Sequence, residues 1–439
     1  MINKTTFTIG IYFILCLFHT SYSQETSRPN VILIMADDMG YECLSTYGSI
    51  SYNTPQLDKL AQDGIKFNNA VSQPLCTPTR VKIMTGQYNY RNYDYFGHLK
   101  TDSYTFGHLF KDAGYKTAVV GKWQLNGLSY KKEILDWNDN TKPNKLGFDE
   151  YCLWQLTTPG NQGSRFANPV IEQNGRFLEA DEDDYGPDIF TNYIIDFISK
   201  NKNHPFFVYY PMVLTHDPFV PTPDSEKWNN KALRHKNDTS NFKDMVEYTD
   251  KIVGKIRAKL QELNIEENTI LIFTADNGTH PTIYTELNSV TIQGAKGNTI
   301  DHGTHVPLIA SWPSKIKEGK TIDDLIEFGD FFATFSHLLN SNKSSDGYSF
   351  LPLLKGQKFE SRKTAFVHYD PRWNKWVSQH RDQFVRSKEY KLYQSGEFYN
   401  LTKDIMEEKP LDTKSLNPDQ KIVYDQLLNE LKKHPKLDD

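Results

Sequence analysis

Four largely apolar runs, each followed within a few residues by polar or charged side chains, constrain the fold of this 439-residue chain more than any other feature. The runs cover residues 30–35, 116–120, 205–210 and 269–273. Runs of this length and composition are typical of parallel strands that are buried on both faces. Helical patterns lie between them, and the alternation predicts a doubly wound α/β sheet. Ligands of such sheets bind beyond the carboxyl ends of the strands.

The residues that follow the first and the last of these runs form a set of oxygen donors. Asp37 and Asp38 follow the first run, and Asp276 and Asn277 follow the last. Four hard oxygen donors without a histidine or a thiolate among them suit Ca²⁺ or Mg²⁺ and disfavour zinc. We therefore expect a cation at this edge of the sheet, with Ca²⁺ preferred.

A segment between the first two runs places a cysteine at the expected start of a helix. Cys76 is followed by Pro78, which suits the first turn of a helix, and Gly86 can end that helix. The free N–H groups at a helix N-terminus favour an anion, and Arg80 can reach the same position from one turn further on. A lone cysteine is by itself more often a small buried apolar residue than a reactive group.

The pattern Cys76-x-Pro78-x-Arg80, followed by Thr-Gly at residues 85–86, resembles the signature of the formylglycine-dependent (type I) sulfatases of the alkaline phosphatase superfamily. Matching segments run from residue 29 to about residue 401, and the whole is similar to secreted bacterial polysaccharide sulfatases. The resemblance implies an alkaline-phosphatase-like α/β fold, in which a large, mostly parallel sheet is flanked by helices.

The resemblance also implies a modified nucleophile. Cys76 would be oxidised after translation to formylglycine (3-oxoalanine) by a formylglycine-generating or sulfatase-maturating enzyme. The hydrated aldehyde would attack the sulfur of a sulfate ester, and sulfate would leave as the aldehyde forms again. The implied cofactor is Ca²⁺, with Asp37, Asp38, Asp276, Asn277 and the converted Cys76 as ligands.

Further residues match the cationic and acidic groups of the family. A sulfate ester spreads negative charge over three oxygens, so clustered cations stabilise its transition state. By the resemblance, Arg80 and Lys122 hold the diol and the developing charge, Lys296 binds the sulfate, and His216 protonates the leaving group.

The chain departs from the family pattern at two places. Gln124 stands where the family usually has a histidine, and an amide can hydrogen-bond the diol but cannot take its proton at neutral pH. His302 and His305 stand in a stretch that usually ends Gly-Gly-x-Arg-Val-Pro. We hypothesise that one of these histidines replaces the missing base or contacts the substrate.

A strip in the C-terminal part of the chain interleaves aromatic rings with cations and includes Arg372 as a candidate substrate contact. Such a strip suits a sugar that carries carboxylates or sulfates, and a structural loop fits the pattern as well. With export, it favours a sulfated polysaccharide or its oligosaccharides, such as an algal cell-wall glycan (ulvan) or a glycosaminoglycan, over a small aryl sulfate. The strip comprises Tyr369, Arg372, Trp373, Lys375, Trp376, His380 and Arg381.

Two other functions are compatible with these residues. A phosphodiesterase or phosphonate hydrolase of the same superfamily can share the modified cysteine, and release of phosphate rather than sulfate would identify it. A glycan-binding homologue that has lost turnover would account for Gln124, and it would bind substrate without releasing product.

Residues 1–23 have the pattern of a secretory signal, with Lys4 ahead of an apolar core over residues 7–18. The pattern predicts export, to the periplasm or out of the cell. No other stretch is apolar enough to predict a membrane anchor. A net charge of −5 on a chain of this size gives no reason to expect nucleic acid as a partner.

The remaining chain is predicted to hold a catalytic domain over residues 24–340 and a smaller α+β subdomain over residues 341–439. Short aromatic and basic alternations in the second part predict a small antiparallel sheet packed by a helix. Residues 126–187 are predicted to be irregular. Cys43 and Cys152 could pair with each other or stay free.

Overall fold

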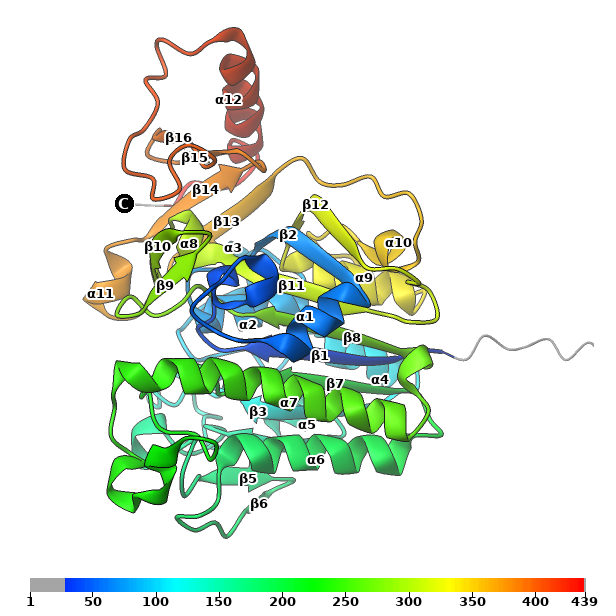
Figure 1. Ribbon diagram of the computed structural model, residues 1–439. Coiled ribbons are helices and arrows are strands. Elements are labelled where there is room, and N and C mark those ends of the chain that lie inside the picture. The colour runs from blue at the N-terminus through cyan, green and yellow to red at the C-terminus, as the bar shows by residue number, and fades with distance from the viewer. Residues whose placement is uncertain (1–27, 438–439) are drawn as a thin grey trace, which may run out of the picture.

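The computed structural model describes residues 28–437, so the predicted signal at residues 1–23 lies outside the described part of the chain. A ten-stranded sheet runs through the middle of the molecule, with helices on both faces (Figure 1). The predicted α/β class with a large, mostly parallel sheet is confirmed. The strand order is β12-β2-β11-β8-β1-β7-β3-β4-β5-β6. None of the helices in the described part is long and apolar enough to cross a membrane.

The four strands that were predicted from apolar runs lie next to one another at the centre of the sheet. β1 pairs in parallel with β7 and β8, and β3 pairs in parallel with β7. All of their residues are buried except Lys116, the first residue of β3. Because the four strands run in one direction, the residues that follow them meet at one edge. Their bounds are β1 Asn30–Ala36, β3 Lys116–Lys122, β7 Phe206–Pro211 and β8 Thr269–Ala275.

Six further strands extend the sheet on both sides. They mix polar with apolar residues or are short, so their apolar runs are too weak to predict them. The prediction that residues 126–187 are irregular is wrong for three of these strands, β4, β5 and β6, and β4 pairs in parallel with β3. The six are β2 Ile65–Val71, β4 Glu150–Trp154, β5 Ile171–Gln173, β6 Arg176–Phe177, β11 His305–Ser311 and β12 Lys320–Glu327.

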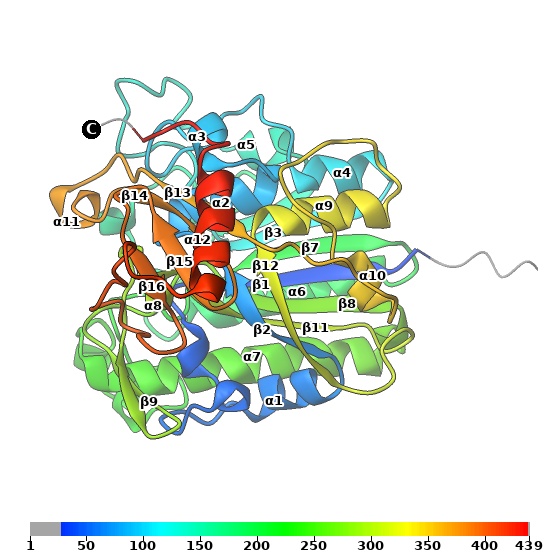
Figure 2. The same ribbon diagram turned by 90° about the horizontal axis from the view of Figure 1, so that it is seen from above.

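Helices cover the sheet on both sides, with α1, α6 and α7 on one face and α2, α4 and α9 on the other (Figure 2). α2 differs from the other long helices because every one of its residues is buried. The long helices are α1 Pro55–Gln62, α2 Cys76–Thr85, α4 Phe106–Asp112, α6 Gly186–Asn201, α7 Phe242–Glu262 and α9 Gly329–Leu338. Short helices are α3 Asn89–Asn92, α5 Lys142–Lys145, α8 Asp301–Thr304, α10 Leu351–Leu354 and α11 Lys375–Ser378.

The C-terminal part forms a separate four-stranded antiparallel sheet in the order β13-β14-β15-β16. α12 packs against this sheet, and its Leu427 and Leu431 are buried in a cluster with Phe366 of β13. The predicted small antiparallel sheet with its helix is confirmed, whereas the boundary at residue 341 stays a prediction. The elements are β13 Ala365–Tyr369, β14 Asp382–Arg386, β15 Tyr390–Tyr393, β16 Phe398–Asn400 and α12 Pro418–Leu431, and a hairpin of β9 Tyr284–Leu287 and β10 Val290–Gln293 lies nearby (Figure 1).

A buried network of charges fixes α2 to its surroundings. Lys82 of α2 forms an ion pair with Glu327 at the end of β12, and both side chains are almost fully buried. Arg362 also contacts Glu327, at 3.2 Å, and it pairs with Asp330 of α9. Buried charges are stable only when they are paired, so this network locks the helix that begins with Cys76 in one position.

A second buried network ties the C-terminal sheet to the loop that follows β10. Arg386 of β14 pairs with Asp301, and Lys391 of β15 contacts Glu407 at 3.0 Å. Lys391 also donates a hydrogen bond to the backbone carbonyl of Thr299. The C-terminal sheet therefore holds the segment that contains Lys296 and the two candidate histidines.

Cys43 and Cys152 are both buried, and both thiols are free. Of the two alternatives for this pair, the structure shows the unpaired one.

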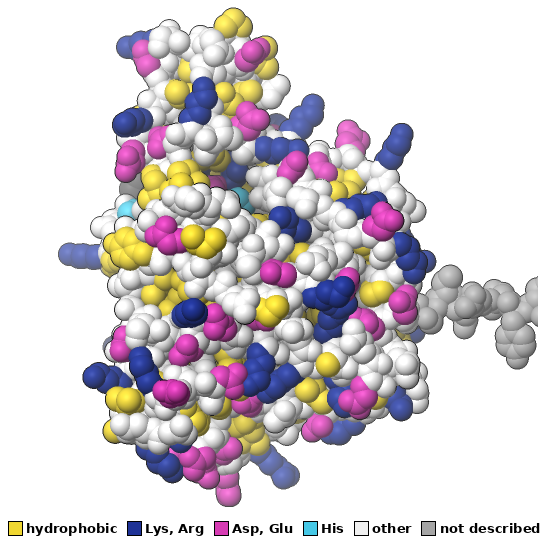
Figure 3. Space-filling model, in the orientation of Figure 1, with side chains coloured by type: hydrophobic (Ala, Val, Ile, Leu, Met, Phe, Trp, Pro, Cys, Tyr) yellow, Lys and Arg dark blue, Asp and Glu magenta, His cyan; other side chains and the backbone are white. Residues whose placement is uncertain are grey.

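The surface carries interspersed charges. On the face shown in Figure 3, lysines and arginines alternate with acidic side chains rather than gathering into one basic area. Nucleic-acid binding usually requires a basic stripe or patch, so this face offers no such footprint.

Candidate active site

The four predicted oxygen donors meet at the carboxyl edge of the central strands, and all four side chains are fully buried. The amide nitrogen Nδ2 of Asn277 donates a hydrogen bond to Oδ1 of Asp38 at 2.8 Å. The backbone N–H of Asp38 donates to Oδ1 of Asp276 at 3.1 Å. The strand ends β1 and β8 are neighbours in the sheet, which is why residues far apart in sequence come together here.

The donor set fits a divalent cation. Asp37, Asp38 and His216 each offer a ligand atom within 4.8 Å of the others. The oxygen Oδ1 of Asn277 is buried and has no hydrogen-bond partner among residues 28–437. A buried amide oxygen without a partner is costly, and a cation beside it would satisfy it. Because this oxygen and the carboxylates are hard donors, Ca²⁺ suits the site better than zinc.

Three cations hold these carboxylates. Nζ of Lys122, the last residue of β3, lies 3.0 and 2.8 Å from the two carboxylate oxygens of Asp37. Arg80 donates to Oδ2 of Asp276 at 2.9 Å and to the backbone carbonyl of Lys122 at 2.9 Å. Lys296 donates to Oδ2 of Asp38.

Burial and these charges lower the pKa of Asp37 and raise the pKa of Asp276. Burial alone would raise the pKa of Asp37, but Lys122, His216 and Arg80 outweigh it and hold the pKa well below its usual range. Burial and the neighbouring charge of Asp37 raise the pKa of Asp276. A cation bound between the strand ends would favour the ionised form of both.

Cys76 is the first residue of α2 and only 2% exposed. Leu75 before it is extended, Pro78 occupies the first turn, and Gly86 ends the helix with a φ of +67°, as its sequence predicted. The thiol contacts Oε1 of Gln124 at 3.3 Å. Burial raises the pKa of the thiol, so an unmodified Cys76 is protonated and a poor nucleophile at neutral pH.

His216 and Lys296 lie together on the other side of Asp38. Nζ of Lys296 is 3.0 Å from Nε2 of His216, and Nδ1 of His216 is 2.9 Å from a carboxylate oxygen of Asp217. Burial would lower the pKa of Lys296, but the charge of Asp38 outweighs it and raises that pKa, which keeps the lysine charged. Asp217 orients the imidazole so that Nε2 points toward the lysine and Asp38.

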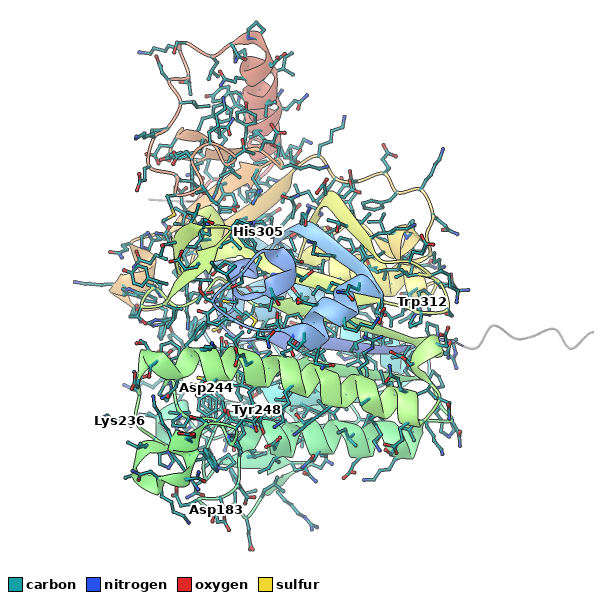
Figure 4. All side chains as sticks on the ribbon, viewed as in Figure 1. Asp183, Lys236, Asp244, Tyr248, His305 and Trp312 are labelled. Atoms are coloured by element: carbon teal, nitrogen blue, oxygen red, sulfur yellow. The ribbon has the colours of Figure 1, made fainter. Side chains whose placement is uncertain are left out.

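His302 and His305 have neighbours other than Cys76 and Gln124. Both ring nitrogens of His305, which Figure 4 labels, are engaged, Nδ1 with Asp301 at 3.0 Å and Nε2 with the backbone carbonyl of Asn68 at 2.9 Å. The ring also stacks on Tyr41. His302 is fully buried, and its ring nitrogens have no partner in the described part of the chain. In the described part of the chain no hydrogen bond or ion pair joins either histidine to Cys76 or Gln124, and the hypothesis that one of them replaces the missing base stays a prediction.

Arg372 follows β13, and its role as a substrate contact stays a prediction. Its side chain is about half exposed and donates a hydrogen bond to Asp370 at 3.0 Å. Its neighbour Trp373 stacks on Phe96 with ring centroids 4.1 Å apart, and Phe96 belongs to the same buried cluster as Cys76.

One residue of the site was missed by the sequence analysis. The guanidinium of Arg165 lies 3.7 Å from Oδ2 of Asp37 and stacks on Trp154 at 4.0 Å. Arg165 comes from residues 126–187, which were predicted to be irregular and matched no motif. The aromatic end of β4, directly beside β3 in the sheet, is the only sequence signal that could have drawn attention to this region.

Acidic side chains that can hold a cation, surrounded by basic side chains at the carboxyl edge of a parallel sheet, are suited to the hydrolysis of an anionic ester. Comparison with known proteins gives the family. A family model described as sulfatase matches residues 29–341, and one described as N-sulphoglucosamine sulphohydrolase, C-terminal, matches residues 296–436. The chain therefore belongs to the sulfatase family.

Curated relatives cover most of the chain. It is 28% identical to human N-acetylgalactosamine-6-sulfatase over 399 residues, which cover 81% of this chain and 71% of the human protein. It is 30% identical to N-acetylgalactosamine-6-O-sulfatase of Bacteroides thetaiotaomicron, with 77% of this chain and 79% of the relative covered. A protein solved with its substrate D-glucosamine-2-N,6-O-disulfate has the same fold, with a TM-score of 0.73, 21% identity, and 93% and 98% of the two chains covered.

Proposed function

We propose that this protein hydrolyses sulfate esters on a sulfated polysaccharide or its oligosaccharides, with formylglycine at position 76 and Ca²⁺ as cofactor. The observation that carries the proposal is the position of Cys76 at the buried start of α2, against Gln124. It lies at the sheet edge where Lys122 and the strand-end oxygens meet.

Burial raises the pKa of the Cys76 thiol, so an unmodified cysteine would be a weak nucleophile here, and the proposed formylglycine would take over that role. When oxidised and hydrated, residue 76 would supply an oxygen nucleophile, and bound Ca²⁺ would stabilise its ionised form. Lys122 and Arg80 hold positive charge beside the nucleophile, and Gln124 orients it by hydrogen bonding. The same proposal includes a maturating enzyme as partner.

The pair of Lys296 and His216 supplies the other half of the reaction. Lys296 is charged, and its ammonium group can bind an oxygen of the sulfate. His216 presents Nε2 beside it, held from behind by Asp217, and can deliver a proton to the oxygen of the departing alcohol.

Two observations support a carbohydrate substrate. The relatives described above include enzymes named for sulfated N-acetylgalactosamine. At the rim of the site, Trp373 and Trp376 are 44% and 46% exposed, and Trp376 lies against Gly297, next to Lys296. Exposed indole rings beside a sulfate-binding residue are suited to stack on sugar rings. A glycosaminoglycan or an algal glycan such as ulvan would carry sulfate esters on sugar rings. Export would bring the enzyme to such a polysaccharide outside the cytoplasm.

The test is release of inorganic sulfate from a panel of sulfated saccharides, with phosphate esters and phosphonates of matched alcohols as comparison. The protein is produced together with a sulfatase-maturating enzyme, and ion chromatography measures both anions. We expect sulfate from at least one saccharide. Release of phosphate alone would favour the phosphodiesterase alternative, and saccharide binding without product would favour the glycan-binding alternative.

Removal of the metal is expected to lower both stability and activity. Addition of Ca²⁺ at about one hundred times its dissociation constant to chelator-treated protein should stabilise the fold by about 2.7 kcal/mol. Asn277→Leu removes the unpartnered oxygen and should abolish most of this shift, which thermal unfolding measures. Asp244→Asn on α7 (Figure 4) is the control and should keep the full shift. Equal stabilisation of Asn277→Leu and wild type would contradict the assigned site.

A further inference from the structure

Arg165 is a largely buried cation that the roles described above do not use. It follows β4 in the chain, and its guanidinium stacks on Trp154, the last residue of that strand. Its side chain is 12% exposed. The stacking sets the orientation of the guanidinium plane, because a planar cation over an indole ring loses contact when it turns.

One nitrogen of the Arg165 guanidinium is also unsatisfied. Its NH1 nitrogen is buried and has no hydrogen-bond partner among residues 28–437. Oδ2 of Asp37 is 3.7 Å away, which is too far for a hydrogen bond, and Lys122 already holds both oxygens of that carboxylate. A buried, charged donor without a partner is costly, so an arginine kept in this place calls for an explanation.

The other cations of the site are all engaged. Lys122, Arg80 and Lys296 each donate to one of the strand-end carboxylates. Arg165 is also near Asp37, but it donates no hydrogen bond to a carboxylate of the described chain. It is therefore the group best able to accept an additional anion without first giving up a partner.

Arg165 reaches the reaction centre from a cavity of about 270 Å³. Ser164 and Asn161 line this cavity beside Arg165, and Pro218 lines it from the loop that carries His216. Two other basic residues of the cavity are already paired, Arg234 with Asp183 and His235 with Glu182. Arg165 therefore lies between this cavity and Asp37.

We propose that Arg165 binds an oxygen of the sulfate ester that is being cleaved, as an additional substrate-binding residue of the catalytic centre. This proposal rests on the proposed sulfatase function. In the complex, the N–H groups of Arg165 donate to the sulfate from the Asp37 side, while Lys296 binds it from the Asp38 side. Two cations on opposite sides fix the sulfur between the nucleophile and His216 and stabilise the charge of the transition state.

The experiment compares Arg165→Gln and Arg165→Lys with wild type in the mature, Ca²⁺-loaded protein. Lys131→Gln is the matched control, because the ammonium group of Lys131 also stacks on an indole ring, 3.9 Å from the ring centroid of Trp137, and has no role in the proposed reaction. Three quantities are measured: the dissociation constant of inorganic sulfate by calorimetry, and kcat/KM for 4-nitrophenyl sulfate and for the saccharide sulfate found in the activity screen. Thermal unfolding checks that the variants are folded.

For Arg165→Gln we expect kcat/KM to fall about 10²-fold on both substrates and sulfate to bind more weakly, with partial recovery in Arg165→Lys. An unchanged sulfate affinity and unchanged rates would overturn the proposal. A loss confined to the saccharide would also overturn it and would assign Arg165 to a charged group of the sugar instead. If wild type binds sulfate but turns over no substrate, the proposed function fails while the calorimetric comparison still decides the role of Arg165.

Discussion

Cys76→Ala is expected to reduce sulfate release by about 10⁴-fold or more, because it removes the nucleophile outright. The fold should survive, since alanine suits the first position of α2 and the thiol makes a single hydrogen bond, to Gln124. Sulfate release under saturating substrate measures the effect, and thermal unfolding measures stability.

Cys152→Ala is the matched control for this variant. Cys152 is a buried free cysteine as well, but it lies in the middle of β4 and follows no site motif. We expect it to keep the activity of wild type with a small loss of stability from the vacated volume. Activity that survives in Cys76→Ala, or that is lost equally in Cys152→Ala, would show that residue 76 is not the nucleophile.

Glu327→Ala is expected to destabilise the protein by about 3–5 kcal/mol, because it leaves the buried cations Lys82 and Arg362 with too few partners. Asp330 then remains as the one acid of the network, and it contacts Arg362 rather than Lys82. Because Lys82 belongs to α2, we also expect lower activity at temperatures well below unfolding. Denaturant titration gives the change in the free energy of unfolding.

Asp425→Ala serves as the comparison for this effect. Asp425 pairs with Lys421 on α12, and both side chains are about half exposed. Exposed pairs on one helix contribute little, so the unfolding curve should hardly move. If Glu327→Ala were as stable as Asp425→Ala, the buried network would not be what holds α2.

The centre of the fold follows directly from its sequence. Strands such as β1 and β8 are continuous apolar runs. Because these strands are parallel neighbours, the polar residues that follow them lie at the same edge of the sheet. The edge strands were harder to predict. β2 reads Ile-Lys-Phe-Asn-Asn-Ala-Val, and its place beside β11 and β12 depends on partners more than 200 residues away in sequence.

The site residues also differ in how far the sequence predicted their positions. Asp37, Asp276 and Lys122 stand at strand ends, where local sequence and motif agree, and the structure brings them into contact. Arg165 stands in a loop without a motif, and only its packing on Trp154 brings it to Asp37. The surroundings of His305 could not be predicted either, because its partners are a backbone carbonyl of β2 and an acid held by Arg386.

The burial of Cys76 also sets an order of events during synthesis. Its cluster includes Tyr369, Phe384 and Tyr393 from the C-terminal sheet, about 300 residues further along the chain. At a translation rate of about 5–20 residues per second, roughly 15 to 60 s pass between the appearance of the cysteine and that of its last neighbours. During this interval the cysteine cannot be fully enclosed. The proposed conversion of Cys76 would therefore have to take place before the C-terminal sheet packs against it, and a chain that folds earlier would keep an unmodified thiol.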